Sequence, residues 1–195
     1  MKVLIVHPSV AYMGGAERVI LNLANTLVSM GVEVEVATSR ITYEFRRNRK
    51  FKIHVGRLPD KLEELGKYDV VNPHNHPAEL WVAPKYTHTV WTCNEPPPYA
   101  QLGGEIIPEE KRIVKENIDR IIVNSNKEKR RIKLLYEMDS VVIYYGIDVE
   151  YWKSRDRELK RHVCDKYSLK DTFNIITVGW VSAVSYTHLT LPTKA

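Results

Sequence analysis

Several features are scarce in this chain of 195 residues, and each absence narrows what the protein can be. No run of about eighteen apolar residues is present, so the sequence contains no candidate transmembrane helix. The first apolar run, at residues 3–6, is too short for the core of a secretory signal peptide, so we expect a cytoplasmic protein. With 9 glycines and 10 prolines, the chain is neither collagen-like nor of low complexity.

Cysteine is scarce too. Cys93 and Cys164 are too few for a disulfide framework or a four-cysteine zinc site, and they fit a reducing compartment. No neighbouring feature would lower the pKa of Cys93. We therefore expect Cys93 to be a buried side chain that behaves as a small hydrophobe, rather than a nucleophile.

Two glycine-rich nucleotide-binding motifs are also missing. Neither GxGxxG nor GxxxxGK[ST] occurs, which argues against a dinucleotide oxidoreductase and against a P-loop NTPase. Gly14 and Gly15 instead follow the first apolar run and precede a helical pattern. Paired glycines allow a backbone to approach a ligand closely and present amides to an anion at a helix N-terminus. The alternative is a tight turn that requires a positive φ angle.

Segments with strand periodicity alternate with segments of helix periodicity. Strands are expected at residues 3–6, 32–36, 51–55, 70–71, 89–92, 121–123, 141–143 and 173–178. Helices are expected at residues 19–28, 58–65, 109–118, 125–136 and 157–167, with a basic loop at 46–50 and a break in regular structure at the prolines 96–98. This alternation predicts the doubly wound α/β class, in which helices cover both faces of a parallel sheet.

Ligands of such sheets bind beyond the carboxyl ends of the strands. Four loops occupy that position, at residues 7–15, 72–77, 93–98 and 144–148. His74 and His76 in the second loop have a spacing that could ligate a metal, but no third ligand is apparent. We therefore favour a substrate hydrogen bond or a structural role, and expect no metal. Glu95 in the third loop could act as a general base, bind a hydroxyl or simply open the proline turn.

The chain is basic, with a formal net charge of +5 and a pI of about 9.1. This charge permits a nucleotide, an anionic lipid or a nucleic acid as partner without choosing among them. Basic residues cluster at 46–50 and at 127–133, the latter on an amphipathic helix. A solvated charged face is the commoner explanation of such clusters, and peripheral contact with the inner face of the membrane is the alternative. We expect no nucleic acid partner.

Residues 184–195 stand apart from the rest of the chain. The sequence from Val184 to Thr193 resembles a translated sequencing adapter, because a common transposase adapter encodes these residues in the same order. Such segments carry no information about the fold of the protein. We therefore expect a gene that is interrupted near Ser182, so that this chain is the front part of a longer protein. The alternative is a natural polar tail.

Five stretches, taken together, resemble the retaining, nucleotide-sugar-dependent glycosyltransferases of family 4 (group 1). They are residues 2–19, with Gly-Gly-Ala-Glu-Arg at 14–18; residues 68–75, with Tyr-Asp-Val-Val before Asn-Pro-His-Asn; residues 90–97, Val-Trp-Thr-Cys-Asn-Glu-Pro-Pro; residues 119–148, ending in Tyr-Tyr-Gly-Ile-Asp; and residues 173–179. The resemblance covers residues 2–182, and its specificity comes from the order and spacing of these motifs.

The resemblance implies a Rossmann-like, acceptor-side domain at residues 1–170, the N-terminal half of a GT-B fold. The donor-side domain would begin at 171–183 and be cut after its first strand. Site residues carried over by the resemblance are Gly14 and Gly15 near the donor's sugar diphosphate; His74, Asn94 and Glu95 on the acceptor side, with His74 and Glu95 as catalytic candidates; and Tyr145, Gly146 and Asp148 in the interdomain turn. Two positions depart from the family pattern, since Asn94 replaces a frequent histidine and Tyr145 replaces Asn or Pro.

The activity implied is transfer of a sugar from a nucleotide-sugar donor to a hydroxyl of a sugar or lipid-linked acceptor, with retained anomeric configuration and without a cofactor. The truncated chain alone is expected to be inactive. Two alternatives remain open: a non-catalytic basic module that binds membrane or nucleic acid, and another nucleotide-sugar enzyme such as an epimerase. Acceptor loops vary while the scaffold stays fixed, so the resemblance specifies neither donor sugar, acceptor nor linkage.

Overall fold

The computed structural model describes residues 1–101, 103–147, 149 and 157–169, and the chain divides into two units, Met1–Gly146 and Ile147–Ala195. Asp148, the expected strand at 173–178 and the expected adapter-derived tail lie outside the described residues. In the second unit the described helix is α9 (Arg157–Lys166), where the sequence predicts a helix. No helix of the described chain combines the length and apolarity needed to cross a membrane.

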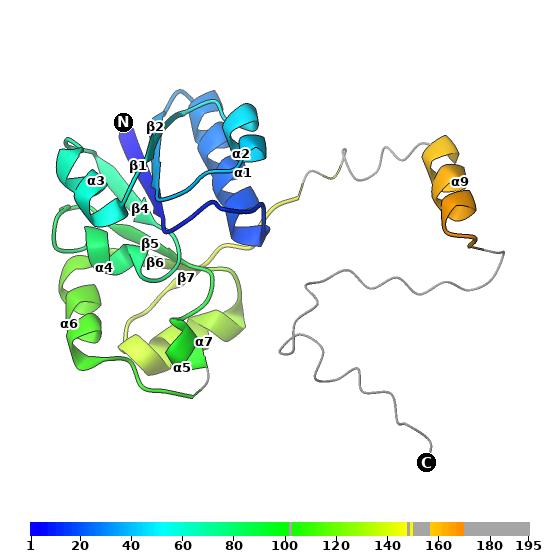
Figure 1. Cartoon of the computed structure of the whole chain (residues 1–195). Helices are drawn as coiled ribbons and strands as arrows, with labels where there is room; N and C mark the ends of the chain where they lie inside the picture. The colour runs from blue at the N-terminus through cyan, green and yellow to red at the C-terminus, as the bar shows by residue number, and fades with distance from the viewer. Residues whose placement is uncertain (102, 148, 150–156, 170–195) are drawn as a thin grey trace, which may run out of the picture. The chain divides into compact units, whose positions relative to one another are not determined.

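The first unit is built on parallel strands (Figure 1). They are β1 (Lys2–His7), β2 (Glu33–Thr38), β3 (Lys52–Val55), β4 (Val70–Pro73), β5 (Val90–Cys93), β6 (Arg120–Val123) and β7 (Val141–Val142). Continuous ladders run in the orders β3-β2-β1-β4 and β5-β6-β7. Two isolated parallel bridges, Val71 to Thr89 and His74 to Thr92, connect β4 to β5. The strand order is therefore β3-β2-β1-β4-β5-β6-β7, and the predicted α/β class is confirmed.

Helices connect successive strands. They are α1 (Gly15–Ser29), α2 (Tyr43–Asn48), α3 (Leu58–Glu64), α4 (Ala78–Val82), α5 (Pro98–Gln101), α6 (Pro108–Asn117) and α7 (Asn126–Tyr136). Helix α1 buries Ile20, Leu21 and Ala24 on one face, and Gly31 with a φ of +83° follows its end, as the helical spacing predicts. Ser125 caps α7 by accepting a hydrogen bond from the Glu128 amide, which confirms the predicted capping pattern.

Two expectations about local structure are wrong, and the sequence predicts no helix at α4. The segment expected to be a basic loop is largely α2, because Thr42 caps the helix and Phe45 is buried against the Phe51 ring at 5.9 Å. Helix α4 has five residues, too few for a helical period to be visible in the sequence. Regular structure resumes within the prolines, since α5 begins at Pro98, and the first turn of a helix tolerates proline.

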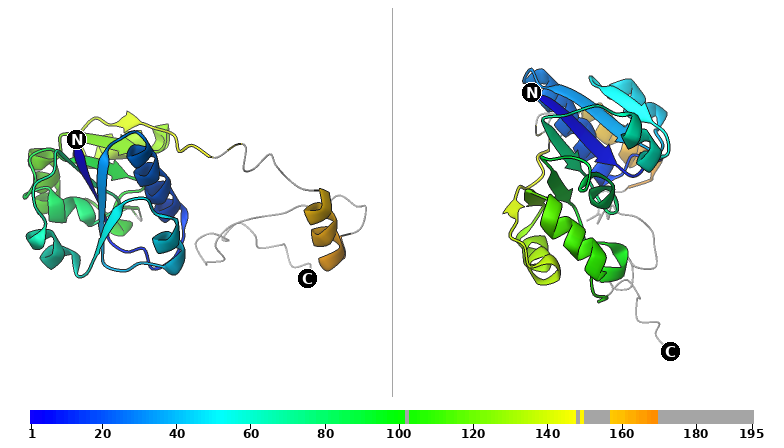
Figure 2. Two further views of the ribbon diagram at one scale, coloured as in Figure 1. Left: turned by 90° about the horizontal axis from the view of Figure 1, so that it is seen from above. Right: turned by 90° about the vertical axis from the view of Figure 1, so that its left-hand side faces the viewer.

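Apolar side chains alternate between the two faces of β1 and define two cores. Val3 and Ile5 pack in the cluster that includes Ile20 of α1, whereas Leu4 and Val6 pack in the cluster that includes Leu62 of α3. Figure 2 shows these helices on opposite sides of the sheet. A third core surrounds β5 and β6, where the rings of Trp91 and Tyr136 meet edge to face at 5.4 Å. With both faces covered, the ends of the strands are where polar loops gather.

Candidate functional site

Polar loops from neighbouring strands meet at the carboxyl edge of the sheet, as the topology predicts. Asn75, after β4, accepts a hydrogen bond at Oδ1 from Nδ2 of Asn94 at 2.5 Å. Asn94 follows β5, and its carbonyl oxygen accepts from Nδ2 of Asn124, after β6, at 2.9 Å. The Tyr145 hydroxyl, after β7, interacts with Asn124, and burial raises the pKa of Tyr145 to about 12. Side chains from three of the four predicted loops and from the loop after β6 thus form one polar row. We call its three asparagines, Asn75, Asn94 and Asn124, the amide row.

The paired glycines lie at the N-terminus of α1, at the same edge. Gly14 is the N-cap residue, with a φ of −86°, so the pair is not explained by a turn that needs positive φ. A Cβ at Gly14 would lie 2.7 Å from Oε2 of Glu17 and 2.9 Å from the ring of Tyr12. A Cβ at Gly15 would have no described heavy atom within 4 Å. Gly14 thus allows a close intramolecular approach, whereas Gly15 borders open space beside the amides of a helix N-terminus.

A buried histidine–glutamate pair supports this glycine loop. Nε2 of His7, at the end of β1, is 3.3 Å from Oε1 of Glu17, and both side chains are almost fully buried. Burial raises the pKa of Glu17, but hydrogen bonds from His7 and from the amides of Glu17 and Gly14 outweigh it and hold that pKa below its ordinary value. Our sequence reasoning missed His7 and Glu17 as site residues. The available signal was a glutamate three residues after the N-cap, where a side chain reaches back to the capping amide.

His74 lies inside the protein rather than on an open surface. Its side chain has no exposed area, and burial lowers its pKa to about 3, so the ring is neutral at physiological pH. Asn72 directs its amide nitrogen to Thr92 Oγ1 at 2.9 Å, so its Oδ1 faces His74 and accepts a hydrogen bond from Nε2 at 2.7 Å. Nδ1 of His74 is left without a partner among the described residues. The backbone carbonyl of His74 accepts from Nδ1 of His7 at 3.3 Å, which connects the β4 loop to the glycine loop.

The remaining predicted site residues are distributed along the same edge. Glu95 is exposed, directly after Asn94 of the amide row. Gly146 is exposed and a Cβ there would have no described atom within 4 Å. Cys93 is fully buried, which confirms the expected burial, and burial raises the pKa of its thiol well above the ordinary value. The roles assigned to these residues by resemblance stay predictions.

His76 belongs to the site in a way that the sequence did not indicate. Its Nδ1 is 2.8 Å from Oε1 of Glu79, a carboxylate in α4 that has no exposed surface. The two histidines of the β4 loop therefore have different partners, Asn72 for His74 and Glu79 for His76. In the described part of the chain no three histidine, cysteine, aspartate or glutamate side chains come together as metal ligands would.

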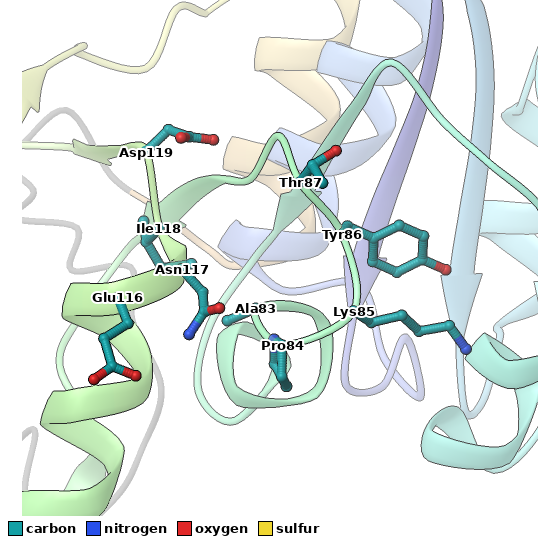
Figure 3. A pocket seen from close by; sticks show the side chains of 9 residues that line it. All are labelled: Ala83, Pro84, Lys85, Tyr86, Thr87, Glu116, Asn117, Ile118 and Asp119. Atoms are coloured by element: carbon teal, nitrogen blue, oxygen red, sulfur yellow. The ribbon is translucent and has the colours of Figure 1, made fainter.

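A hollow of about 310 Å³ lies away from this edge. Figure 3 shows the side chains that line it. Its wall consists of residues 83–87, which precede β5, and residues 116–119, which precede β6. The lining is mainly polar, and the carboxylate of Asp119 already accepts a hydrogen bond from the Thr89 amide at 2.8 Å. This hollow is at the amino ends of the strands, opposite to the edge where ligands of such sheets bind.

The strand order and the polar carboxyl edge define a Rossmann-like domain of the kind that forms the N-terminal half of GT-B glycosyltransferases. The sequence profile of Glycosyltransferase Family 4 matches residues 13–151, and the chain belongs to that family. No curated protein matches the chain.

Solved structures with a similar fold include HepE from Anabaena in complex with UDP-glucose, with a TM-score of 0.71, 16% identity and coverage of 89% of this chain and 51% of that chain. HepE in complex with UDP and glucose has a TM-score of 0.69 and 15% identity, with coverage of 86% of this chain and 50% of that chain. The apo form of the lipopolysaccharide outer core galactosyltransferase WaaB has a TM-score of 0.55 and 16% identity, with coverage of 75% of this chain and 46% of that chain. The chain spans about half the length of these structures.

Proposed function

We propose that this chain is the acceptor-side half of a glycosyltransferase that moves a sugar from a nucleotide-sugar donor to an acceptor hydroxyl with retained configuration. The observation that carries the proposal is the open space at Gly15, beside the N-terminus of α1, in a chain that belongs to glycosyltransferase family 4. HepE, a structural neighbour, binds UDP and UDP-glucose, which supports a nucleotide-sugar donor.

In this proposal the donor diphosphate approaches the backbone at Gly15. No Cβ blocks the approach there, and the N-terminal end of α1 carries partial positive charge. The acceptor oxygen forms a bond to the anomeric carbon while the bond from that carbon to the leaving phosphate oxygen breaks on the same face. The acceptor proton passes to the leaving phosphate. Backbone amides stabilise the developing negative charge, so the step draws on preorganised dipoles rather than on a protein base.

The acceptor would lie along the amide row and the exposed Glu95. Primary amides both donate and accept, as sugar hydroxyls do, so a row of asparagines matches a carbohydrate surface. His74 would act through its neighbours, because its buried ring fixes Asn72 and its carbonyl holds His7. Helix α7 is where membrane contact would occur, through the exposed Leu134 and nearby basic residues.

The test is to express the gene read past codon 183 and to assay transfer from UDP-sugars and GDP-sugars. The proposal expects a second Rossmann half, with a paired-glutamate motif, and turnover of a nucleotide sugar, whereas the chain of 195 residues turns over none. Gly15→Leu should abolish turnover by filling the open space. Gly66→Leu is the matched control, because a Cβ at Gly66 also has no described atom within 4 Å but precedes β4 at the opposite edge. A longer product that fails to turn over any nucleotide sugar would overturn the proposal.

A further inference from the structure

The pair formed by His76 and Glu79 has an exposed side and a buried side. His76 is in the loop after β4, and Glu79 is in the first turn of α4. Nδ1 of His76 faces Oε1 of Glu79 at 2.8 Å. The His76 side chain keeps 18% of its surface exposed, and the Glu79 side chain keeps none. Nε2 of His76 makes no hydrogen bond with the described residues and is not among their buried polar atoms, so it faces solvent.

Titratable groups from three helices face this imidazole. Glu79 belongs to α4, Tyr99 of α5 meets the ring edge to face at 6.0 Å, and the Tyr99 hydroxyl donates to Glu110 of α6. Burial lowers the pKa of His76, but the hydrogen bond and charge of Glu79, together with the charge of Glu110, raise it above its ordinary value. Burial raises the pKa of Glu79 against the opposing effect of His76.

A purely structural role does not account for Glu79. Its second carboxylate oxygen, Oε2, is buried without a hydrogen-bond partner in the described chain, which costs free energy. Helix α4 has only five residues, so a first-turn carboxylate gains little from the helix dipole. What the contact does achieve is to fix the His76 ring with Nε2 outward, as buried carboxylates do for catalytic imidazoles.

The position of Nε2 relates it to the acceptor. His76 directly follows Asn75, the first member of the amide row, and Asn75 is hydrogen-bonded to Asn94. Tyr99, against the ring, follows the loop that contains Asn94 and Glu95. An imidazole nitrogen, the amide row and an aromatic ring thus come together at one edge of the sheet, and this combination suits a sugar with several hydroxyl groups.

We propose that Nε2 of His76 hydrogen-bonds a hydroxyl of the acceptor sugar, and that buried Glu79 is the positioning residue that holds the imidazole in place. The inference rests on the proposed function and adds to it a residue of the acceptor site. His76→Asn keeps a donor near Nδ1 and loses Nε2, whereas His76→Gln keeps a polar group near Nε2. Glu79→Gln keeps the volume and removes the charge.

The binding experiment uses the chain of 195 residues and requires no catalysis. Imidazole resonances are followed by NMR while methyl β-glucoside, methyl β-galactoside and methyl N-acetyl-β-glucosaminide are added as probes. We expect the His76 resonance to shift saturably with at least one probe. In His76→Asn, binding is followed through the backbone amide resonance of Asn94, and the affinity should be about tenfold weaker. His76→Gln should restore part of the affinity. In Glu79→Gln the pKa of His76 should fall. His88→Asn is the matched control, since His88 is exposed before β5 at the opposite edge.

The kinetic experiment uses the product of the gene read past codon 183. His76→Asn should raise the acceptor KM about tenfold, whereas the control His88→Asn, before β5 at the opposite edge, should leave it unchanged. Absence of any probe shift at His76, or equal shifts at His76 and His88, overturns the inference. Unchanged acceptor KM in His76→Asn also overturns it while the proposed function stands. Absence of donor turnover in the unmutated product instead overturns the proposed function.

Discussion

Asn72 donates its side-chain amide to the carbonyl oxygen of Val90, at the position where the parallel ladder would use a backbone N–H of residue 73. Residue 73 is proline and has no such donor. On either side the ladder is normal. The backbone amide of Val71 donates to the carbonyl oxygen of His88 at 2.9 Å, and the backbone amide of Asn75 donates to the carbonyl oxygen of Thr92 at 3.4 Å. The side chain of Asn72 thus supplies the missing hydrogen bond between β4 and β5. The amide row depends on this strand pairing, because Asn75 follows β4 and Asn94 follows β5.

Replacing Asn72 by aspartate should weaken the pairing of β4 with β5. Aspartate keeps an oxygen for His74 Nε2 but leaves the Val90 carbonyl and the Thr92 hydroxyl without their donor. We expect a loss of roughly 2–4 kcal/mol in the free energy of unfolding, because buried polar groups lose their partner and a carboxylate is buried. Urea denaturation measures it. Asn126→Asp, at an exposed position in the first turn of α7, should lose nothing, and equal losses at both sites would contradict the prediction.

His74 should make the stability depend on pH. Its pKa in the folded protein is about 3, below the ordinary value of 6.5. The unfolded chain therefore binds a proton between these two values and the folded chain does not, so stability falls as pH decreases from 6.5 toward 3. The slope from this one group is at most about 1.4 kcal/mol per pH unit.

Urea denaturation at successive pH values tests this prediction. His74→Gln can still donate to Asn72 but does not titrate, so its stability should decline less steeply over the window. The exposed His88 serves as control, and His88→Gln should keep the slope of the unmutated protein. Parallel slopes in all three proteins would show that His74 is not the responsible group.

The sequence predicts this sheet well because its strands are short apolar runs bounded by breakers. Val3–Val6, for example, are buried on both faces of β1, and such a run needs no information from the rest of the chain. Helix α4 and the start of α5 are different. They are single turns fixed by tertiary packing, as the buried Ala78 and Ala100 show, and no local period indicates them.

The candidate site was predicted as a set of loops but not as a set of contacts. Topology alone places Asn94 and Gly15 at the carboxyl edge. It does not show that His74 turns inward while His76 faces outward, because that choice depends on which partner each ring meets, Asn72 or Glu79. Hydrogen bonds between residues that are distant in sequence carry this information, and a single sequence does not reveal them.

Glu35 of β2 should stabilise the protein at neutral pH, at a place in the sheet away from the amide row. This buried carboxylate of β2 meets Nε2 of His54 at 2.6 Å, the Tyr68 hydroxyl at 2.7 Å and Nζ of Lys2 at 3.2 Å. Burial raises its pKa, but these partners outweigh burial and lower it from 4.5 to about 2. The stabilisation is therefore complete above about pH 4.5 and is lost as pH falls toward 2.

Glu35→Gln tests that prediction. The variant should lose roughly 2–3 kcal/mol in the free energy of unfolding at pH 7, and the difference from the unmutated protein should shrink as the pH is lowered toward 2. The control is Glu33→Gln, since Glu33 is 64% exposed and contacts Lys2 only at 3.6 Å. It should change stability by no more than about 0.5 kcal/mol. A pH-independent difference for Glu35→Gln would contradict the assignment.

The paired glycines should respond differently to the same methyl group. At Gly14 a Cβ would collide with Oε2 of Glu17 and the Tyr12 ring, and the carboxylate has little freedom to move because His7 and two amides hold it. We expect Gly14→Ala to lose roughly 1–3 kcal/mol in the free energy of unfolding, from strain and from disruption of the buried pair. Gly15→Ala meets no described atom within 4 Å, so the fold should tolerate it and gain up to about 1 kcal/mol, because alanine restricts the unfolded chain. Thermal unfolding of the two variants decides the matter, and equal melting temperatures would show that Gly14 is not needed for the close approach of Glu17.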